Sequence, residues 1–345
     1  MARGRKKKIK YSPQDENPQL SLMPEYDFQF IRSAVKKVLL AWELHTQSLK
    51  NDSPMLLAFS GGKDSVCLYY ICKKASEKIG VPFEKMFYAQ YNITNLDPPE
   101  LVQFVRKQFP DVKMHHPEKT FWKLLLEKKM PPFRSQRWCC AELKEISSLP
   151  DAFSLTGVRR AESRKRADRE GLEGRGNKPS ERITLLNDND ELRKDIDVCS
   201  LKRVWVCNPL IDWSDEQVWA FIRHENLPYC CLYDEGFHRL GCIGCPLSGE
   251  KERERDFKRW PKYEEQYIRT FQRLLDLFKT DEALRERERE RRATPRALLF
   301  NSLFIDGQDM FDWWMYRPAF KERHRKELED YKDTLFEETD NDNTP

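Results

Sequence analysis

The chain has 345 residues, of which 34% are charged and 39% apolar, and its formal net charge is +4. This size allows one large domain or one domain with a substantial extension, and the chain has no run of about eighteen apolar residues that could span a membrane. The basic start, MARGRKKKIK, is not followed by the apolar segment of a secretory signal. We therefore expect a cytoplasmic protein whose ten cysteines are thiols, metal ligands or redox groups rather than disulfides.

The N-terminal region, residues 1–24, is a basic and then polar tail. Its composition is typical of a disordered leader. Its cluster of lysines and arginines would also suit an arm that contacts nucleic-acid phosphates. Residues 25–50 follow with an apolar rhythm that indicates a helix.

The central feature of the chain is a strand–turn–helix segment. Residues 55–59 are apolar and indicate a buried strand, and SGGKDS at 60–65 follows as a sharp turn. The next helix is predicted from apolar residues at four-residue spacing and from a glycine that ends it; these are Cys67, Ile71, Ala75, Ile79 and Gly80. Because adjacent glycines allow close approach of a ligand and a helix start favours anions, we interpret the turn as a phosphate cradle rather than a turn without a ligand. Asp64 follows Lys63 where a Walker A loop has Ser or Thr, which excludes that motif.

Strands and helices then alternate along the chain, which predicts a doubly wound, mostly parallel α/β sheet. Further elements are expected as strands at 83–91, 112–115, 152–157 and 204–206, a helix at 98–109 and a helix capped by Ser214 or Asp215. Ligands of such sheets bind at the carboxyl ends of the strands, where the cradle and residues 92–95 lie. Residues 167–200 are interpreted as a long polar insertion, and from residue 250 we expect two or three highly charged helices.

Three segments each have a simple alternative explanation. Residues 158–166 place arginines just past the fourth strand, where they could hold phosphate or sulfate or form a solvated basic face. The charge run at 284–292 is interpreted as a solvated helix with internal ion pairs. An aromatic patch is interpreted as core rather than as a base-stacking platform; it consists of Phe311, Trp313, Trp314 and Tyr316.

Four cysteines form two pairs that are about a hundred residues apart, Cys139–Cys140 and Cys242–Cys245. An iron–sulfur cluster requires four thiolates around one centre, and CxxC supplies two of them from a tight turn. We favour a 4Fe–4S cluster. The alternatives are a structural zinc ion and two buried thiols beside an unrelated redox CxxC.

Together these segments resemble the phosphoadenosine and adenosine phosphosulfate reductase family, part of the adenine nucleotide alpha-hydrolase (PP-loop ATP pyrophosphatase) superfamily, over roughly residues 50 to 250. Four blocks carry the resemblance. They are SGGKDS at 60–65, RWCCAELK at 137–144, TGVRRAESRKR at 156–166, and NPLIDWSDEQVW at 208–219 with LPYCCLYDEGFHRLGCIGCP at 227–246. The expected organisation is a tail at 1–24, a PP-loop domain with the cysteine site at 25–249, and a charged helical extension at 250–345.

The resemblance implies roles for individual residues. The phosphates of the nucleotide would be bound by Ser60, Gly61, Gly62, Lys63, Asp64 and Ser65. Gly157 would lie near the adenosine, and the phosphate or sulfate end would face Arg159, Arg160, Ser163 and Arg166. The candidate catalytic residues are Lys63, Asp64, Arg159 and Arg160, and Asp64 is also a candidate Mg²⁺ ligand. The 4Fe–4S cluster would be carried by Cys139, Cys140, Cys242 and Cys245.

The sequence departs from the family pattern in two places. The family's reductases attack the sulfate with a cysteine near the C-terminus, whereas the last cysteine here is Cys245. The aspartate–threonine–glycine expected after the second strand is replaced by residues 92–95, Asn-Ile-Thr-Asn.

The first departure argues against a reductase. We interpret the protein as an ATP pyrophosphatase that adenylylates its substrate for sulfur transfer, because it resembles the subunit that activates the DNA backbone for phosphorothioate formation. The expected partners are an adenine nucleotide, nucleic acid (DNA or tRNA) and a sulfur donor such as a cysteine desulfurase. The alternatives are an adenylyl-sulfate reductase and a nucleotide- or nucleic-acid-binding module without turnover.

Overall fold

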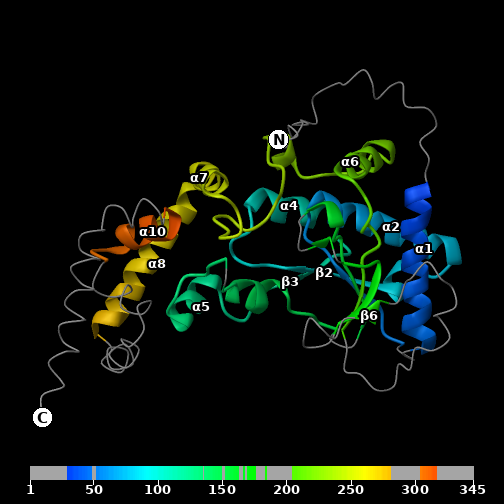
Figure 1. The fold of residues 1–345 in the computed structure, drawn as a ribbon, viewed down its shortest axis with the longest axis horizontal. Helices are drawn as coiled ribbons and strands as arrows, with labels where there is room; N and C mark the ends of the chain where they lie inside the picture. The colour runs from blue at the N-terminus through cyan, green and yellow to red at the C-terminus, as the bar shows by residue number, and fades with distance from the viewer. Residues whose placement is uncertain are drawn as a thin grey trace, which may run out of the picture. The chain divides into compact units, whose positions relative to one another are not determined.

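The computed structural model describes residues 29–48, 52–134, 136–149, 152–162, 166–167, 169–175, 183–184, 204–280 and 304–316. The chain divides into two compact units (Figure 1). The first unit comprises Met1–Ile93, Asp97–Pro117 and Lys144–Gly241, and the second comprises Thr94–Leu96, Glu118–Leu143 and Cys242–Pro345. The basic tail and the charge run at 284–292 lie outside the described residues. The domain boundaries expected from the sequence stay a prediction, and the two units divide the chain at other positions.

A mostly parallel sheet organises the first unit. Its seven strands among the described residues have the order β3-β2-β1-β4-β7-β5-β6. The five parallel strands are β1 (Met55–Ala58), β2 (Phe87–Asn92), β3 (Lys113–His115), β4 (Ser154–Leu155) and β7 (Val204–Cys207). The register sets Leu57 against Ala89 of β2 and Leu155 of β4. The predicted α/β fold is therefore confirmed.

The helices of this unit follow the predicted segments. The helix after the cradle is α2 (Lys63–Ile79), and Gly80 ends it in the left-handed conformation. Ser214 begins α6 (Asp215–His224) with a capping box that it shares with Gln217. Both α6 and α1 (Gln29–Glu43) pack against α2. The remaining helices are α3 (Phe83–Met86) and α4 (Pro99–Gln108).

The structure corrects two expectations for this unit. The strand expected at 83–91 begins only at Phe87, because Phe83–Met86 form the short helix α3. The insertion at 167–200 contributes two antiparallel strands to the sheet, β5 (Leu172–Arg175) and β6 (Ile183–Thr184), and β5 pairs with β7. Strand β5 carries Glu173, which is buried and paired with Arg169 at 2.5 Å. Because a buried position of β5 carries this charged residue, the strand lacks the apolar pattern by which a buried strand is predicted from sequence.

The described helices of the second unit are α5 (Phe121–Lys128), α7 (Glu250–Arg259), α8 (Pro261–Thr280) and α10 (Gly307–Met315) (Figure 1). Helix α8 packs against the other three. Tyr267 of α8 is fully buried, and its ring lies 4.9 Å from that of Trp314 in a stacked arrangement. Of the aromatic patch that the sequence indicated as core, Phe311, Trp313 and Trp314 are buried, whereas Tyr316 is partly exposed.

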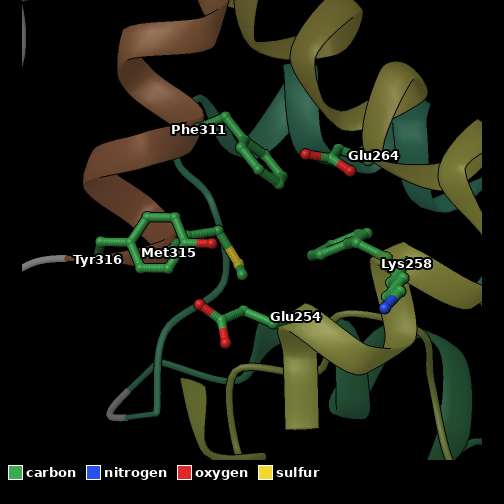
Figure 2. Close-up of a pocket in the computed structure, with 7 residues that line it drawn as sticks. Glu254, Lys258, Glu264, Phe311, Met315 and Tyr316 are labelled. Carbon is green, nitrogen blue, oxygen red and sulfur yellow. The ribbon is translucent and has the colours of Figure 1, made fainter. Parts of the chain in front are cut away.

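A small pocket of about 170 Å³ opens between α7, α8 and α10 (Figure 2). Its walls combine aromatic rings, a methionine and charged groups, and the lining residues are Glu254, Phe257, Lys258, Glu264, Phe311, Met315 and Tyr316. Among the described residues no helix is both long and apolar enough to cross a membrane.

Candidate functional site

The cradle lies where the direction of the sheet connections reverses. Strand β1 has a parallel neighbour on each side, β2 and β4. The cradle follows β1 and Gly157 follows β4, so both lie at the carboxyl ends of adjacent strands. Ligands of open α/β sheets bind at such a switch point. The sequence placed the cradle at a strand end of this kind, and the strand order now locates it within the sheet.

The backbone of the cradle depends on glycine. Gly61 has φ +72°, and a Cβ atom added there would lie 2.7 Å from the side chains of Leu101 and Val105. The turn is tightened by Ser65, whose hydroxyl donates to the carbonyl of Gly62 at 2.9 Å and accepts from the hydroxyl of Ser60 at 3.3 Å. Helix α2 then begins at Lys63, so its first N–H groups face the turn.

Gly157 also has a packing role. A Cβ atom added at Gly157 would lie 3.1 Å from the backbone carbon of Asp64. The end of β4 therefore approaches the start of α2 closely, and a larger residue would push the two segments apart. The adenosine contact expected for Gly157 stays a prediction.

Beside the cradle, two cations alternate with two carboxylates. Arg159 is 2% exposed, and its Nε donates to Asp64 Oδ1 while its Nη2 donates to Asp215 Oδ1, each at 2.6 Å. Lys63 Nζ lies 3.4 Å from a carboxylate oxygen of each acid. Although burial opposes ionisation, Lys63 and Arg159 hold the pKa of Asp215 below its usual range. Each positive group is thus held by two negative groups.

Tyr233 forms a hydrogen bond with one backbone N–H group of the cradle. Its hydroxyl oxygen accepts the backbone N–H of Lys63 at 2.9 Å, and its side chain is almost entirely buried. Burial raises the pKa of this phenol, so it stays neutral. A phosphate oxygen that approached the first N–H of α2 would meet this hydroxyl. Neither Tyr233 nor Asp215 was assigned to the cradle from the sequence, although both lie in blocks that carry the family resemblance, because only the fold brings such distant residues to it.

The two neighbouring arginines have different surroundings. Arg160 directs its guanidinium group to Asp212 and to Glu170, whose carboxylate it meets at 2.9 Å, whereas Arg159 is bound to Asp64. The described contacts therefore bring Arg159 to the cradle and involve Arg160 in a separate ion-pair cluster. The catalytic role expected for Arg160 stays a prediction.

A second group of cations lies near Asp64. Burial, together with repulsion from Arg239 and Arg169, lowers the pKa of Arg166, and Asp64 attracts it. Arg166 also pairs with Glu162. An anion in this region would relieve the repulsion among the arginines. Ser163 lies outside the described residues.

All four predicted cysteine ligands belong to the second unit, and each is partly buried. A hydrogen bond with Cys140, burial, and the charges of Cys140, Cys242 and Cys245 raise the pKa of the Cys139 thiol. Cys139 therefore interacts with each of the other three cysteines. Among the described residues, no group of three or more His, Cys, Asp or Glu side chains is arranged as a ligand set for a single metal ion.

The segment that departs from the family pattern approaches the cysteine site. The hydroxyl of Thr94, which is 1% exposed, lies 3.4 Å from the sulfur of Cys242. Asn95 has φ +65°, and its side-chain oxygen accepts the N–H of Phe121 at 3.3 Å. Asn92, at the end of β2, donates to the carbonyl oxygen of Ile146 at 2.8 Å. The replacement residues thus contact protein groups, and no sequence pattern indicated the contact between Thr94 and Cys242.

The other described cysteines differ in exposure. Four of them are buried, and burial raises the pKa values of their thiols; these are Cys67, Cys72, Cys207 and Cys230. Cys231 is exposed and begins the short 3₁₀ turn, Cys231–Tyr233, that brings Tyr233 to the cradle. Cys199 lies outside the described residues.

Residues 54–248 match the family described as phosphoadenosine phosphosulfate reductase domain. The chain belongs to this family. The resemblance read from the sequence motifs is thereby confirmed, and the family is one of nucleotide-modifying enzymes.

Among the curated relatives of the chain is an uncharacterized protein of Methanocaldococcus jannaschii. The two are 29% identical over 235 residues, which cover 62% of this chain and 42% of the relative. An adenosine 5'-phosphosulfate reductase of Staphylococcus epidermidis is 30% identical over 158 residues, or 42% of this chain and 53% of the relative. The chain thus spans about half the length of the curated relatives that it matches.

Solved structures similar to the chain include a phosphoadenylyl-sulfate reductase from Candida auris in a phosphate complex. It is 16% identical, covers 64% of this chain and 96% of its own, and has a TM-score of 0.38. An FMN adenylyltransferase from Candida glabrata in complex with FAD and pyrophosphate is 14% identical with a TM-score of 0.37, and it covers 66% of this chain and 68% of its own.

Proposed function

We propose that this family member is an ATP pyrophosphatase that adenylylates an oxygen of its substrate in preparation for sulfur transfer. An acceptor oxygen would attack the α-phosphorus of ATP, the bond to the β-phosphate oxygen would break, and pyrophosphate would leave. The observation that supports this most directly is that two buried cations, Lys63 and Arg159, both pair with Asp64 at the cradle. Two buried cations beside a helix start suit the charge that develops on a leaving pyrophosphate.

The acidic residues of the same network suggest how ATP enters it. Asp64 and Asp215 now neutralise Lys63 and Arg159. When phosphates arrive, both cations can turn to them, which frees the carboxylates. Mg²⁺ binds one or two carboxylates together with substrate phosphates, so Asp64 fits as a ligand once Arg159 has released it. Lys63 and Arg159 would then hold the phosphates in place for in-line attack.

The four cysteines of the second unit would hold a 4Fe–4S cluster. Their thiol donor set fits the group, because Cys139 interacts with each of the other three cysteines and a cluster spreads its thiolates over several irons. Zinc fits less well, because it needs four donors around one ion. When bound, such a cluster supplies electron transfer or sulfur chemistry.

Nucleic acid is the acceptor class we favour. The lysines and arginines of residues 1–10 suit phosphate contacts and would add affinity that falls with salt. A sulfur donor such as a cysteine desulfurase would complete the reaction. Salt-dependent binding of DNA or tRNA by the full chain is the expected result.

Pyrophosphate release from ATP by the anaerobically purified protein tests the proposal. Asp64→Ala should lower that release at least about 100-fold while leaving iron and sulfide content unchanged. Asp212→Ala is the matched control, because Asp212 is an exposed acid that pairs with Arg160 and Lys37. A fully active Asp64→Ala variant would contradict the assignment of the cradle. Tight ATP binding without any turnover would instead indicate a binding module.

A second candidate, an adenylyl-sulfate reductase, is favoured by the exposure of Cys231 near the cradle. Its thiolate would attack the sulfur of adenosine phosphosulfate and release AMP. A second thiol would then displace sulfite and leave a disulfide. Sulfite release that Cys231→Ser abolishes would establish this reaction, and sulfite release that persists in Cys231→Ser would remove Cys231 from it.

A further inference from the structure

The CxxC turn rests on two consecutive residues of α7. Gly244 has φ +68°, and a Cβ atom added there would lie 2.4 Å from the ring of Phe257. The N–H of Gly244 donates to Asp256 Oδ2 at 3.3 Å, and Asp256 is 8% exposed. The turn between Cys242 and Cys245 is therefore covered by a ring and bound by a buried carboxylate. Both groups come from the segment that follows the matched family region.

The adjacent pair Cys139–Cys140 is connected to helix α8 through aromatic contacts of its neighbour Trp138. The neighbouring Trp138 stacks on Phe121 with ring centres 5.4 Å apart, and its Nε1 donates to the carbonyl of Met130 at 3.2 Å. Phe121 in turn lies edge-on to Tyr267 of α8 at 5.6 Å. The two cysteine pairs thus reach one aromatic core from different stretches of the chain.

Tyr267 contacts the aromatic residues that support both cysteine pairs. Its ring contacts Phe121 on one side and Phe257 on another, at 5.6 Å each, and it is fully buried. Its ring is therefore packed between the residue that supports Trp138, next to Cys139, and the residue that covers Gly244 of the CxxC turn.

We propose that α7 and α8 hold the two cysteine pairs in register as one thiol site, with Asp256 and Tyr267 as positioning residues. Asp256 fixes the CxxC turn through the N–H of Gly244. Tyr267 fixes the spacing between the pairs through the contacts of its ring with Phe121 and Phe257. The identity of the bound group rests on the proposed function, whereas the positioning concerns the chain's own residues. The ring of Phe257 that covers Gly244 also lines the pocket between α7, α8 and α10.

The first test uses full-length protein that a chelator has freed of metal. Iodoacetamide alkylation of each cysteine is followed by mass spectrometry. Asp256→Ala should speed alkylation of Cys242 and Cys245 about tenfold, because one hydrogen bond to a charged group is lost. Asp256→Asn keeps an acceptor and should restore the slow rate. Glu254→Ala, an acid on the pocket side of the same helix, is the control and should match the wild type, and equal rates in all four proteins would overturn the proposal.

The second test uses protein loaded with iron and sulfide. Asp256→Ala should retain less iron than Asp256→Asn. Tyr267→Phe keeps the ring and should retain full iron, whereas Tyr267→Leu loses the ring contacts with Phe121 and Phe257 and should retain less. Full iron in every variant would overturn the positioning roles. A wild type that protects its thiols in the first test yet binds no iron would instead refute the cluster and leave the positioning in place.

Discussion

The cradle and the cysteine site are held in place by different kinds of contact. At the cradle, Lys63, Asp64, Arg159 and Asp215 hold one another through ion pairs and charged hydrogen bonds. At the cysteine site, the supporting contacts are packed rings around Tyr267, with a single carboxylate, Asp256, at the turn. Charged partners can be exchanged for a ligand's charges, whereas a packed aromatic core resists rearrangement. The first site is therefore suited to bind and release, and the second to stay fixed.

Removing Arg159 should have the largest effect on the first site. Arg159→Met leaves Asp64 and Asp215 without one of the two cations that they share, and we expect ATP turnover to fall about 100- to 1,000-fold and stability to fall by about 3 kcal/mol. Arg160→Met is the matched control and should cost about 1 kcal/mol, since its ion pairs are partly exposed. Pyrophosphate assays and urea unfolding measure both effects. Equal losses in the two variants would show that Arg159 has no special place at the cradle.

Removing a ring should break the second site and spare the first. Trp314 is 3% exposed, stacks on Tyr267 and donates from Nε1 to the carbonyl of Pro132 at 3.0 Å. Trp314→Ala should therefore cost about 4 kcal/mol and lower iron content while ATP binding persists. Tyr316→Ala, at the partly exposed end of the same helix, should cost far less. Calorimetry with an ATP titration would separate the two units, and loss of ATP binding together with iron would argue against their independence.

The pH dependence of the second site follows from Asp256. Burial raises the pKa of this carboxyl to about 6, above the usual 3.8. Below about pH 4 the group is protonated whether the chain is folded or unfolded, and above about pH 6 folding must bury its charge. Stability should therefore fall by about 3 kcal/mol as the pH rises between these values. Asp256→Asn should abolish that fall, and identical pH profiles of melting temperature in wild type and variant would contradict the assignment.

The smallest expected effect is at Tyr233. Tyr233→Phe leaves the N–H of Lys63 without an acceptor in the nucleotide-free protein, which should cost about 1–2 kcal/mol. Because a phosphate oxygen can satisfy this N–H, the melting temperature should rise further on adding ATP than it does in the wild type. Tyr229→Phe, which removes a hydroxyl that donates to the exposed carboxylate of Asp234, is the control. An unchanged response to ATP would mean that the phosphates do not reach this donor.

The sequence predicted what depends on local pattern. The strand, turn and helix around SGGKDS, the cap at Ser214 and the buried ring of Trp314 all follow from spacing or residue type within a few positions. Strand β5 was missed because its central Glu173 is buried against a cation instead of alternating with apolar residues.

The candidate sites were predicted less completely. The motif identified Lys63 and Asp64, but their partners Asp215 and Tyr233 are brought to them only by tertiary structure. The contact between Thr94 and Cys242 spans 148 residues and belongs to no spacing rule. Pairings of this kind become visible only when the chain is folded.

The close fit of Gly244 against Phe257 affects how the chain can be shortened. The matched family region ends at residue 248. A fragment that ends there keeps every cysteine of the matched region, because the last one is Cys245. It would nevertheless expose Gly244 to solvent and remove the acceptor of its N–H. Expression fragments meant to retain the thiol site should therefore extend at least through Trp314.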